Sequence, residues 1–139
     1  MRSACAASVR PRAIRLRRLS EEVVVAHPVV HFEIAGKEAK QTQRFYASLF
    51  DWEIDTQSMG EEYGTIRGGD GGIGGGLMAA PTGQPYVTVY IQVDDLPAYL
   101  AKAESLGGKA LIQPTEIPGG GAWAMFQDPD GNMVGLYKG

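Results

Sequence analysis

The stretch VVHFEI, residues 29–34, leads through RFY at 44–46 to LFDWEI at 49–54. In its first six residues apolar and polar side chains alternate, which is typical of a strand with one buried face. From residue 38 to 50 apolar residues recur three and four positions apart, which predicts an amphipathic helix. The whole stretch therefore predicts a strand, a helix and a second strand that begins at Asp51.

The same order of elements returns further along the chain, where Thr88 stands 57 positions after His31. An alternating run at 87–93 predicts another strand, and Asp95 followed by Pro97 is typical of the first turn of a helix. Further strands are expected at 109–112, 122–126 and 133–137, with a tight turn at the Asp-Pro-Asp-Gly sequence of residues 128–131.

This repetition predicts an α+β fold of two tandem βαβββ modules, at about 28–80 and 86–138. A helix that covers one face of each module leaves the other face free and polar. We expect the two modules to form a cupped mixed sheet around a central cavity, with the helices outside.

Composition is that of a single globular domain. The chain has 139 residues, of which 44% are hydrophobic, enough for a sizeable core. No apolar run approaches the roughly 20 residues of a membrane helix, so no membrane contact is expected. Cys5 is the single cysteine, which argues against a disulfide framework and predicts a cytoplasmic location.

Charge is divided unevenly along the chain. Residues 1–20 contain six Arg and no acidic residue, whereas residues 21–139 contain seven Lys or Arg against 16 Asp or Glu, a net charge of −9. Contacts with phosphate groups need clustered positive charge, so the acidic part argues against nucleic-acid binding.

Residues 1–27 do not share the pattern of the domain at 28–138. Three interpretations stay open: a translation start assigned too far upstream, with Val25 as the true start, a disordered tail, and an Arg-rich leader that lacks acidic residues. Mass spectrometry of the native N-terminus distinguishes them.

A glycine-rich segment runs from Gly68 to Gly76 and is interrupted by Asp70 and Ile73. It lacks the Gly-Lys-Ser/Thr sequence that ends a phosphate-binding loop. We therefore expect a turn followed by a strand that needs small side chains.

Several motifs point to a known family: His31, the Phe-Tyr pair at 45–46, Phe-Asp-Trp-Glu at 50–53, Val-Asp-Asp at 93–95 and Asp-Pro-Asp-Gly-Asn at 128–132. Together they resemble the vicinal oxygen chelate superfamily, which includes glyoxalase I, bleomycin-resistance proteins and extradiol dioxygenases. The resemblance covers residues 28–138 and is strongest to bacterial glyoxalase-related single-domain proteins. It implies the fold described above and a homodimer.

Metalloenzymes of this superfamily carry ligands at four positions, on the first and last strand of each module. His31 matches one position, whereas Thr88, Gly76 and Gly135 stand at the others. Thr is a poor metal ligand, Gly has no side chain, and catalytic zinc usually has three protein ligands. The resemblance therefore implies an incomplete metal site and no cofactor, with a divalent metal at His31 and Glu33 as the alternative. We expect the two glycines to open additional volume in the cavity.

Strand alternation predicts which side chains line the cavity. The residues on the face away from the helices are His31, Glu33, Thr88, Tyr90, Gln92, Met133, Gly135 and Tyr137, and Trp123 stands on a strand that also contributes. Aromatic walls with a few polar groups suit a small organic ligand. The alternative is that these side chains fill the cavity themselves.

Three functions are consistent with this pattern. The first is metal-independent binding of a small organic metabolite or drug. The second is a lyase- or isomerase-type enzyme in which His31 or Glu33 moves a proton, because the ordinary histidine pKa of about 6.5 suits acid–base chemistry. The third is a partner-binding subunit without catalysis, in which His31 is a hydrogen-bonded cavity residue.

Overall fold

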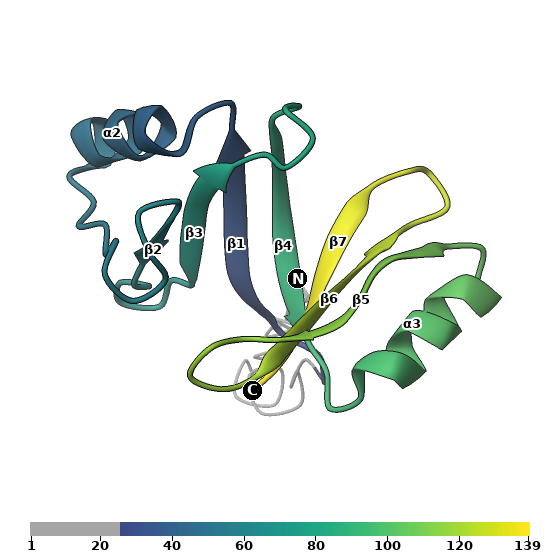
Figure 1. Cartoon of the computed structure of the whole chain (residues 1–139). Coiled ribbons are helices and arrows are strands. Elements are labelled where there is room, and N and C mark those ends of the chain that lie inside the picture. The colour runs from purple at the N-terminus through teal and green to yellow at the C-terminus, as the bar shows by residue number, and fades with distance from the viewer. Residues whose placement is uncertain (1–25) are drawn as a thin grey trace, which may run out of the picture.

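The computed structural model of the chain describes residues 26–139. These residues form a seven-stranded mixed sheet and two helices, which confirms the predicted α+β class (Figure 1). Neither helix is long and apolar enough to cross a membrane. The predictions for residues 1–25 lie outside the described part.

In chain order the elements are β1 (Val29–Gly36), α2 (Ala39–Phe50), β2 (Tyr63–Ile66), β3 (Gly74–Ala79), β4 (Tyr86–Gln92), α3 (Leu96–Ser105), β5 (Lys109–Glu116), β6 (Ala122–Gln127) and β7 (Met133–Lys138).

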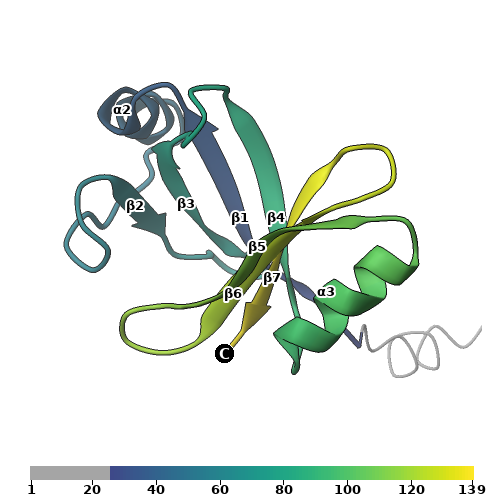
Figure 2. The same ribbon diagram turned by 45° about the vertical axis from the view of Figure 1, so that its right-hand side comes forward.

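The order of strands across the sheet is β2-β3-β1-β4-β7-β6-β5. At the centre β1 and β4 are antiparallel, and each has a parallel neighbour on its other side, β3 beside β1 and β7 beside β4. The outer pairs β2–β3, β7–β6 and β6–β5 are antiparallel. The two halves of the chain thus join through β1 and β4 into one curved sheet (Figure 2).

The prediction of a strand beginning at Asp51 is wrong. Residues 51–54 have no regular structure, and Asp55 makes only an isolated bridge with Thr65. The Asp55 carboxylate instead turns the chain, because its Oδ1 accepts the backbone N–H of Gln57 at 2.7 Å and of Ser58 at 3.2 Å. Residues 86–138 therefore follow the predicted βαβββ order, whereas residues 29–79 contain one strand fewer.

Helix α3 begins as the sequence predicts. Oδ1 of Asp95 accepts the backbone N–H of Ala98 at 3.0 Å, and Pro97 occupies the first turn, where the helix needs no N–H donor. A buried apolar cluster attaches the helix to the sheet, and it consists of Val93, Leu96, Leu100, Ala124 and Leu136. Because side chains alternate along a strand, the neighbours of Ala124 and Leu136 face away from α3.

Helix α2 directs only part of its predicted apolar stripe toward the sheet. Phe45, Leu49 and Phe50 are exposed by 59%, 57% and 53%, respectively, whereas the buried positions of the helix are Ala39 and Gln43. The apolar side chains at the C-terminal end of the helix therefore lie on the outside of the protein.

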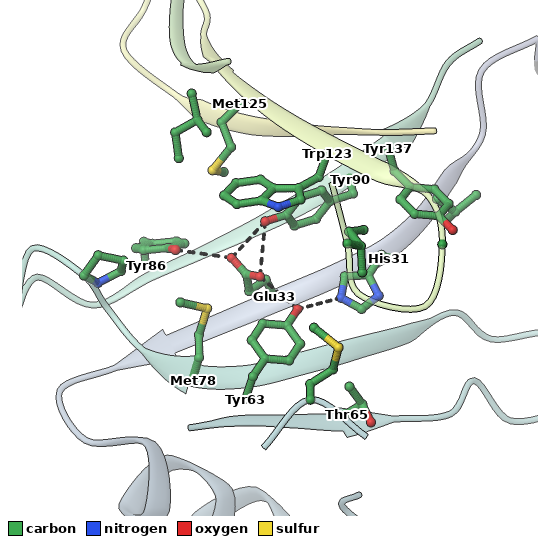
Figure 3. Close-up of a pocket in the computed structure, with 16 residues that line it drawn as sticks. His31, Glu33, Tyr63, Thr65, Met78, Tyr86, Tyr90, Trp123, Met125 and Tyr137 are labelled. Atoms are coloured by element: carbon green, nitrogen blue, oxygen red, sulfur yellow. Dashed lines mark hydrogen bonds between the residues drawn. The ribbon is translucent and has the colours of Figure 1, made fainter. Parts of the chain in front are cut away.

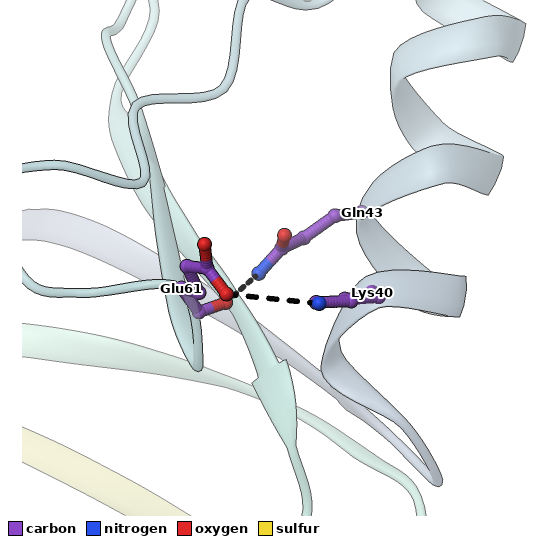
Figure 4. A network of polar contacts seen from close by, with 3 residues as sticks. All are labelled: Lys40, Gln43 and Glu61. Carbon is purple, nitrogen blue, oxygen red and sulfur yellow. Dashed lines mark hydrogen bonds and ion pairs between the residues drawn. The ribbon is translucent and has the colours of Figure 1, made fainter.

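Polar contacts explain this rotation of α2. Nε2 of Gln43 donates to the carbonyl oxygens of Glu61 at 3.0 Å and Leu77 at 3.2 Å, and Nζ of Lys40 lies 3.6 Å from Oε2 of Glu61 (Figure 4). These bonds direct the side of the helix that carries Gln43 toward the sheet, since a buried side-chain amide needs hydrogen-bond partners. Tyr46 instead stacks on Trp52, with ring centroids 5.9 Å apart.

Candidate functional site

A cavity of about 560 Å³ opens on the face of the sheet opposite the apolar cluster that packs α3. All seven strands contribute to its wall, together with the segments that join them. Most of the lining is aromatic or aliphatic. The lining residues are Val30, His31, Glu33, Met59, Tyr63, Thr65, Met78, Pro81, Tyr86, Tyr90, Ile112, Ile117, Gly120, Trp123, Met125 and Tyr137.

Five of the predicted site residues lie around this cavity, namely His31, Glu33, Tyr90, Trp123 and Tyr137 (Figure 3). They come from both halves of the chain, and strand alternation brings them to one face. Their roles toward a ligand stay predictions.

The other four predicted site residues do not line the cavity. Thr88 is buried, and its Oγ1 donates to the carbonyl oxygen of Met133 at 2.7 Å, a bond that joins β4 to β7. Gln92 is exposed at the end of β4. Gly135 is buried under the ring of Tyr90. A binding role for these four also stays a prediction.

The expectation that Gly76 and Gly135 open extra volume in the cavity is wrong. The ring of Tyr63 covers Gly76, and the ring of Tyr90 covers Gly135, each so closely that a Cβ atom on the glycine would overlap the ring. The two strand pairings that bring these residues together are β2 with β3 and β4 with β7. Glycine is thus required here for close approach of an aromatic side chain.

Glu33 is the centre of a network of tyrosine hydroxyl groups. Its Oε2 accepts from Tyr63 at 2.9 Å and from Tyr90 at 3.2 Å, and its Oε1 accepts from Tyr90 at 3.1 Å and from Tyr86 at 3.2 Å (Figure 3). The side chain is only 4% exposed. Three hydroxyl donors on one carboxylate stabilise its ionised form, which accepts and does not donate.

Burial and hydrogen bonding act on this network in opposite directions. Burial raises the pKa of Glu33, and the hydroxyl groups of Tyr63, Tyr90 and Tyr86 partly offset that increase. Burial and the nearby Glu33 charge also raise the pKa of Tyr86 to about 12, and those of Tyr63 and Tyr90 further still. The three hydroxyl groups therefore keep their protons over the physiological pH range and remain donors.

His31 extends the network by one further bond. Its Nε2 lies 2.9 Å from the hydroxyl oxygen of Tyr63. Because the single proton of Tyr63 is donated to Glu33, Nε2 of His31 must carry a proton and donate it. Burial lowers the pKa of His31, so the ring is neutral near pH 7 and Nδ1 keeps a free lone pair.

The side chains around His31 and Glu33 do not fit a tightly held metal ion. Within residues 26–139, no three His, Cys, Asp or Glu side chains are grouped as metal ligands. The Tyr63 hydroxyl bonds to both His31 and Glu33. The ring of Tyr63 covers Gly76, which stands at one of the four ligand positions of the superfamily's metalloenzymes. A site with three protein ligands is therefore not formed by these residues.

Sequence reasoning missed two members of the network, Tyr63 and Tyr86. Tyr86 was detectable, because it lies two and four positions before Thr88 and Tyr90 and strand alternation places all three on one face. Tyr63 was not detectable, because its position beside Glu33 depends on how β2 pairs with β3 across the glycine-rich segment.

Glu33 is expected to make folding less favourable as the pH rises through its titration. Its pKa in the folded state is raised above the ordinary 4.5, so between the two pKa values the folded chain binds more protons than the unfolded chain. The free energy of unfolding then decreases with increasing pH. We expect the free energy of unfolding of wild type minus that of Glu33→Gln, measured by urea unfolding, to decrease as the pH rises above the ordinary pKa of 4.5.

The same comparison controls for the other titrating groups around Glu33. His31 has a lowered pKa and contributes the opposite slope below its ordinary pKa, but it is present in both proteins. Tyr63, Tyr86 and Tyr90 stay protonated throughout this range. A difference that stays constant or increases with pH contradicts the prediction.

The chain belongs to the Glyoxalase/Bleomycin resistance protein/Dioxygenase superfamily, which matches residues 29–136. This confirms the resemblance seen in the sequence. One relative, "Putative glyoxylase CFP32" of Mycobacterium tuberculosis, is 35% identical over 80 residues, which cover 57% of this chain and 31% of the relative. Another, the anthracycline biosynthesis protein DnrV of Streptomyces peucetius, is 25% identical over 124 residues, which cover 77% of this chain and 45% of the relative. The chain thus spans less than half the length of these curated relatives.

Solved structures show the same fold. The methylmalonyl-CoA epimerase from Mycobacterium tuberculosis aligns with a TM-score of 0.58 and 14% identity, over 86% of this chain and 94% of the epimerase. The Mn(II)-bound glyoxalase from Novosphingobium aromaticivorans aligns with a TM-score of 0.56 and 20% identity, over 79% of this chain and 38% of the glyoxalase. At these identities the likeness concerns the fold alone.

Proposed function

We propose that this protein binds one small organic molecule in the aromatic cavity of its curved sheet. The supporting observation is a cavity of about 560 Å³ lined mainly by aromatic and aliphatic side chains. This volume lies within the range of about 300–1,000 Å³ found for ligand pockets. Both curated relatives are also named for small-molecule chemistry, one as a glyoxylase and one for anthracycline biosynthesis.

Tryptophan fluorescence tests this proposal directly. The chain has two Trp residues, Trp52 and Trp123, and only Trp123 lines the cavity. In a Trp52→Phe variant, ligand binding is expected to change the emission of Trp123 and to raise the melting temperature. The matched Trp123→Phe variant should show no emission change from Trp52. A broad compound screen without any shift in either signal overturns the proposal.

We propose further that ligand binding requires no metal ion. The donors around His31 and Glu33 do not form a set of three, as described above. Elemental analysis of the purified protein, followed by thermal shift with Zn²⁺, Ni²⁺, Mn²⁺, Co²⁺ and Fe²⁺, is expected to show neither stoichiometric metal nor stabilisation. Clear stabilisation by one ion contradicts this.

A second candidate function is proton transfer of the lyase or isomerase type. The observation that favours it is the chain of bonds from His31 through Tyr63 to Glu33 on the cavity wall. Neutral His31 has a free Nδ1 that can take a proton from a ligand, while its Nε2–H bond to Tyr63 holds the ring in place. A positioned acid or base of this kind contributes about 10²–10⁴-fold to rate.

Paired histidine substitutions test that alternative. His31→Gln is expected to lower kcat for any substrate found by about 10²–10⁴-fold. His27→Gln is the matched control, since His27 bonds to Tyr99 and to the Gln92 carbonyl outside the cavity, and it should leave kcat unchanged. Equal turnover by both variants removes His31 from the mechanism.

We also propose that two copies of the chain form a homodimer. This proposal is supported by large apolar side chains that are exposed to solvent. Val87 is 70% exposed, and Phe45, Leu49 and Phe50 are each more than half exposed. Large apolar side chains that are exposed in this way are often covered by a partner when they lie together. Light scattering coupled to size exclusion should give twice the mass of the chain, and Val87→Lys should shift it toward the monomer. A wild-type monomer contradicts the proposal.

A further inference from the structure

When ionised, the carboxylate of Glu33 is a buried negative charge for which residues 26–139 provide no Lys or Arg partner. Among residues 26–139, no Lys or Arg lines the cavity. In the part of the chain that the structure describes, the one ion pair joins Lys40 to Glu61 on the other side of the sheet. Burying an ionised carboxylate without a counter-charge costs considerable free energy, even when hydroxyl groups donate to it.

The carboxylate also retains capacity for another donor. Its two oxygens offer about four acceptor positions. Four contacts reach them, but Tyr90 makes two of these with a single hydroxyl proton, so only three protons are shared among the four positions. Glu33 is itself among the residues that line the cavity. A donor on a ligand can therefore approach the oxygens from the cavity side.

The walls around Glu33 favour a positively charged donor over a neutral one. Tyr63, Tyr86, Tyr90 and Trp123 surround the carboxylate (Figure 3). The faces of such rings carry partial negative charge and attract cations, an effect that strengthens when water is excluded. Residues 26–139 contain seven Lys or Arg against 14 Asp or Glu, and this net charge of −7 also attracts cations at long range.

The rest of the cavity suits an apolar body attached to that cation. Three methionines line it, Met59, Met78 and Met125, together with Ile112 and Ile117. Methionine side chains adapt to irregular apolar shapes and contact aromatic rings favourably. The cavity thus has one charged point and an otherwise apolar wall.

From these observations we infer that the ligand is an organic cation: an amine whose ammonium group lies beside Glu33 among the tyrosine rings, with an aromatic or aliphatic body along the methionine side. This inference rests on the proposed function, because it names the chemical class of the ligand in the same cavity. A neutral hydroxyl or amide donor satisfies the remaining acceptor position but leaves the carboxylate charge uncompensated.

A charge-matched panel of compounds tests the inference. Each aromatic body, phenylpropyl, naphthylmethyl or anthracenylmethyl, carries in turn an ammonium, a hydroxyl or a carboxylate group. Binding is measured at constant salt by the fluorescence of Trp123 in full-length Trp52→Phe protein. The amine is expected to bind roughly tenfold to a hundredfold more tightly than the alcohol of the same body, the effect of one charge-assisted hydrogen bond.

Two variants separate the local charge from the overall charge. Glu33→Gln keeps the size of the side chain and is expected to remove the preference, so that the amine and the alcohol bind with about equal affinity. Glu53→Gln removes the same charge from an exposed position and should leave the preference intact.

If Glu33→Gln does not fold, the pH dependence of binding replaces it, because the affinity of the amine must fall as Glu33 is protonated while that of the alcohol stays constant. Tyr63, Tyr86 and Tyr90 also face Glu33 but stay protonated over this range. His31 lines the same cavity, and a protonated imidazole also repels the amine, so this titration uses His31→Gln protein for both compounds.

The outcomes distinguish this inference from the proposed function. Tight binding of alcohols or carboxylates with no preference for amines overturns the cationic ligand and leaves small-molecule binding standing. An equal loss of preference in Glu33→Gln and Glu53→Gln also overturns it, because the attraction is then a long-range effect. The absence of binding by every compound of the panel overturns the inference together with the proposed occupancy of this cavity.

Discussion

Replacing Gly135 by alanine is expected to lower the free energy of unfolding by about 1–3 kcal/mol. An added Cβ atom at this position overlaps the ring of Tyr90. The ring cannot easily move, because Tyr90 is 7% exposed and its hydroxyl group bonds to both oxygens of Glu33. The strain therefore reaches the centre of the proposed binding site. Urea unfolding followed by circular dichroism measures the change.

A matched glycine and a second substitution identify the cause. A Cβ atom added at Gly69 meets no neighbour within 4 Å, so Gly69→Ala should change stability by less than about 0.5 kcal/mol. In a Tyr90→Ala background the ring is absent, and Gly135→Ala should then cost little. Equal losses for Gly135→Ala with and without the Tyr90 ring show that the ring is not the obstacle.

Leu77→Ala is expected to destabilise the protein by about 2–5 kcal/mol. Leu77 on β3 has 0% exposure, and no other side chain of its size is so completely buried among the described residues. Its strand neighbour Met78 lines the cavity, so alternation directs Leu77 to the opposite face of β3. Helix α2 is attached to β3 at this point, because Gln43 donates to the Leu77 carbonyl oxygen. The substitution leaves a void between strand and helix that closely packed neighbours cannot fill.

An exposed leucine provides the comparison for that prediction. Leu106 is 70% exposed, and Leu106→Ala should stay within about 0.5 kcal/mol of wild type. Because small domains have only about 5–15 kcal/mol of stability, Leu77→Ala is best measured at low temperature or with a stabilising osmolyte. A loss at Leu77 as small as that at Leu106 contradicts the packing described here.

Local sequence patterns predicted the elements whose signals are contained in a few consecutive residues. Alternation placed His31 and Glu33 on one face of β1 and Tyr90 on the matching face of β4, and the Asp95 cap marked the start of α3. The tight turn at Asp128 is likewise present, with the N–H of Gly131 donating to the carbonyl oxygen of Asp128 at 3.0 Å. Such features follow from the geometry of a single strand, helix end or turn.

Contacts between distant segments were not predictable in the same way. The spacing of apolar residues over 38–50 predicted an amphipathic helix, but the bonds of Gln43 to Glu61 and Leu77 orient that helix so that Phe45 and Leu49 are exposed. The glycines at 76 and 135 predicted open space, whereas tyrosine rings from neighbouring strands occupy it.

The sequence by itself determined the class of fold, the family and the places of His31, Glu33 and Tyr90 on the cavity face, because these depend on periodicity and on short motifs. Only the tertiary structure decided what surrounds Glu33. The hydroxyl groups of Tyr63, Tyr86 and Tyr90 meet its carboxylate from positions 30 and 53 to 57 residues away along the chain. Their meeting depends on the register of β2 with β3 and of β1 with β4, and that register is set by the packing of the whole sheet.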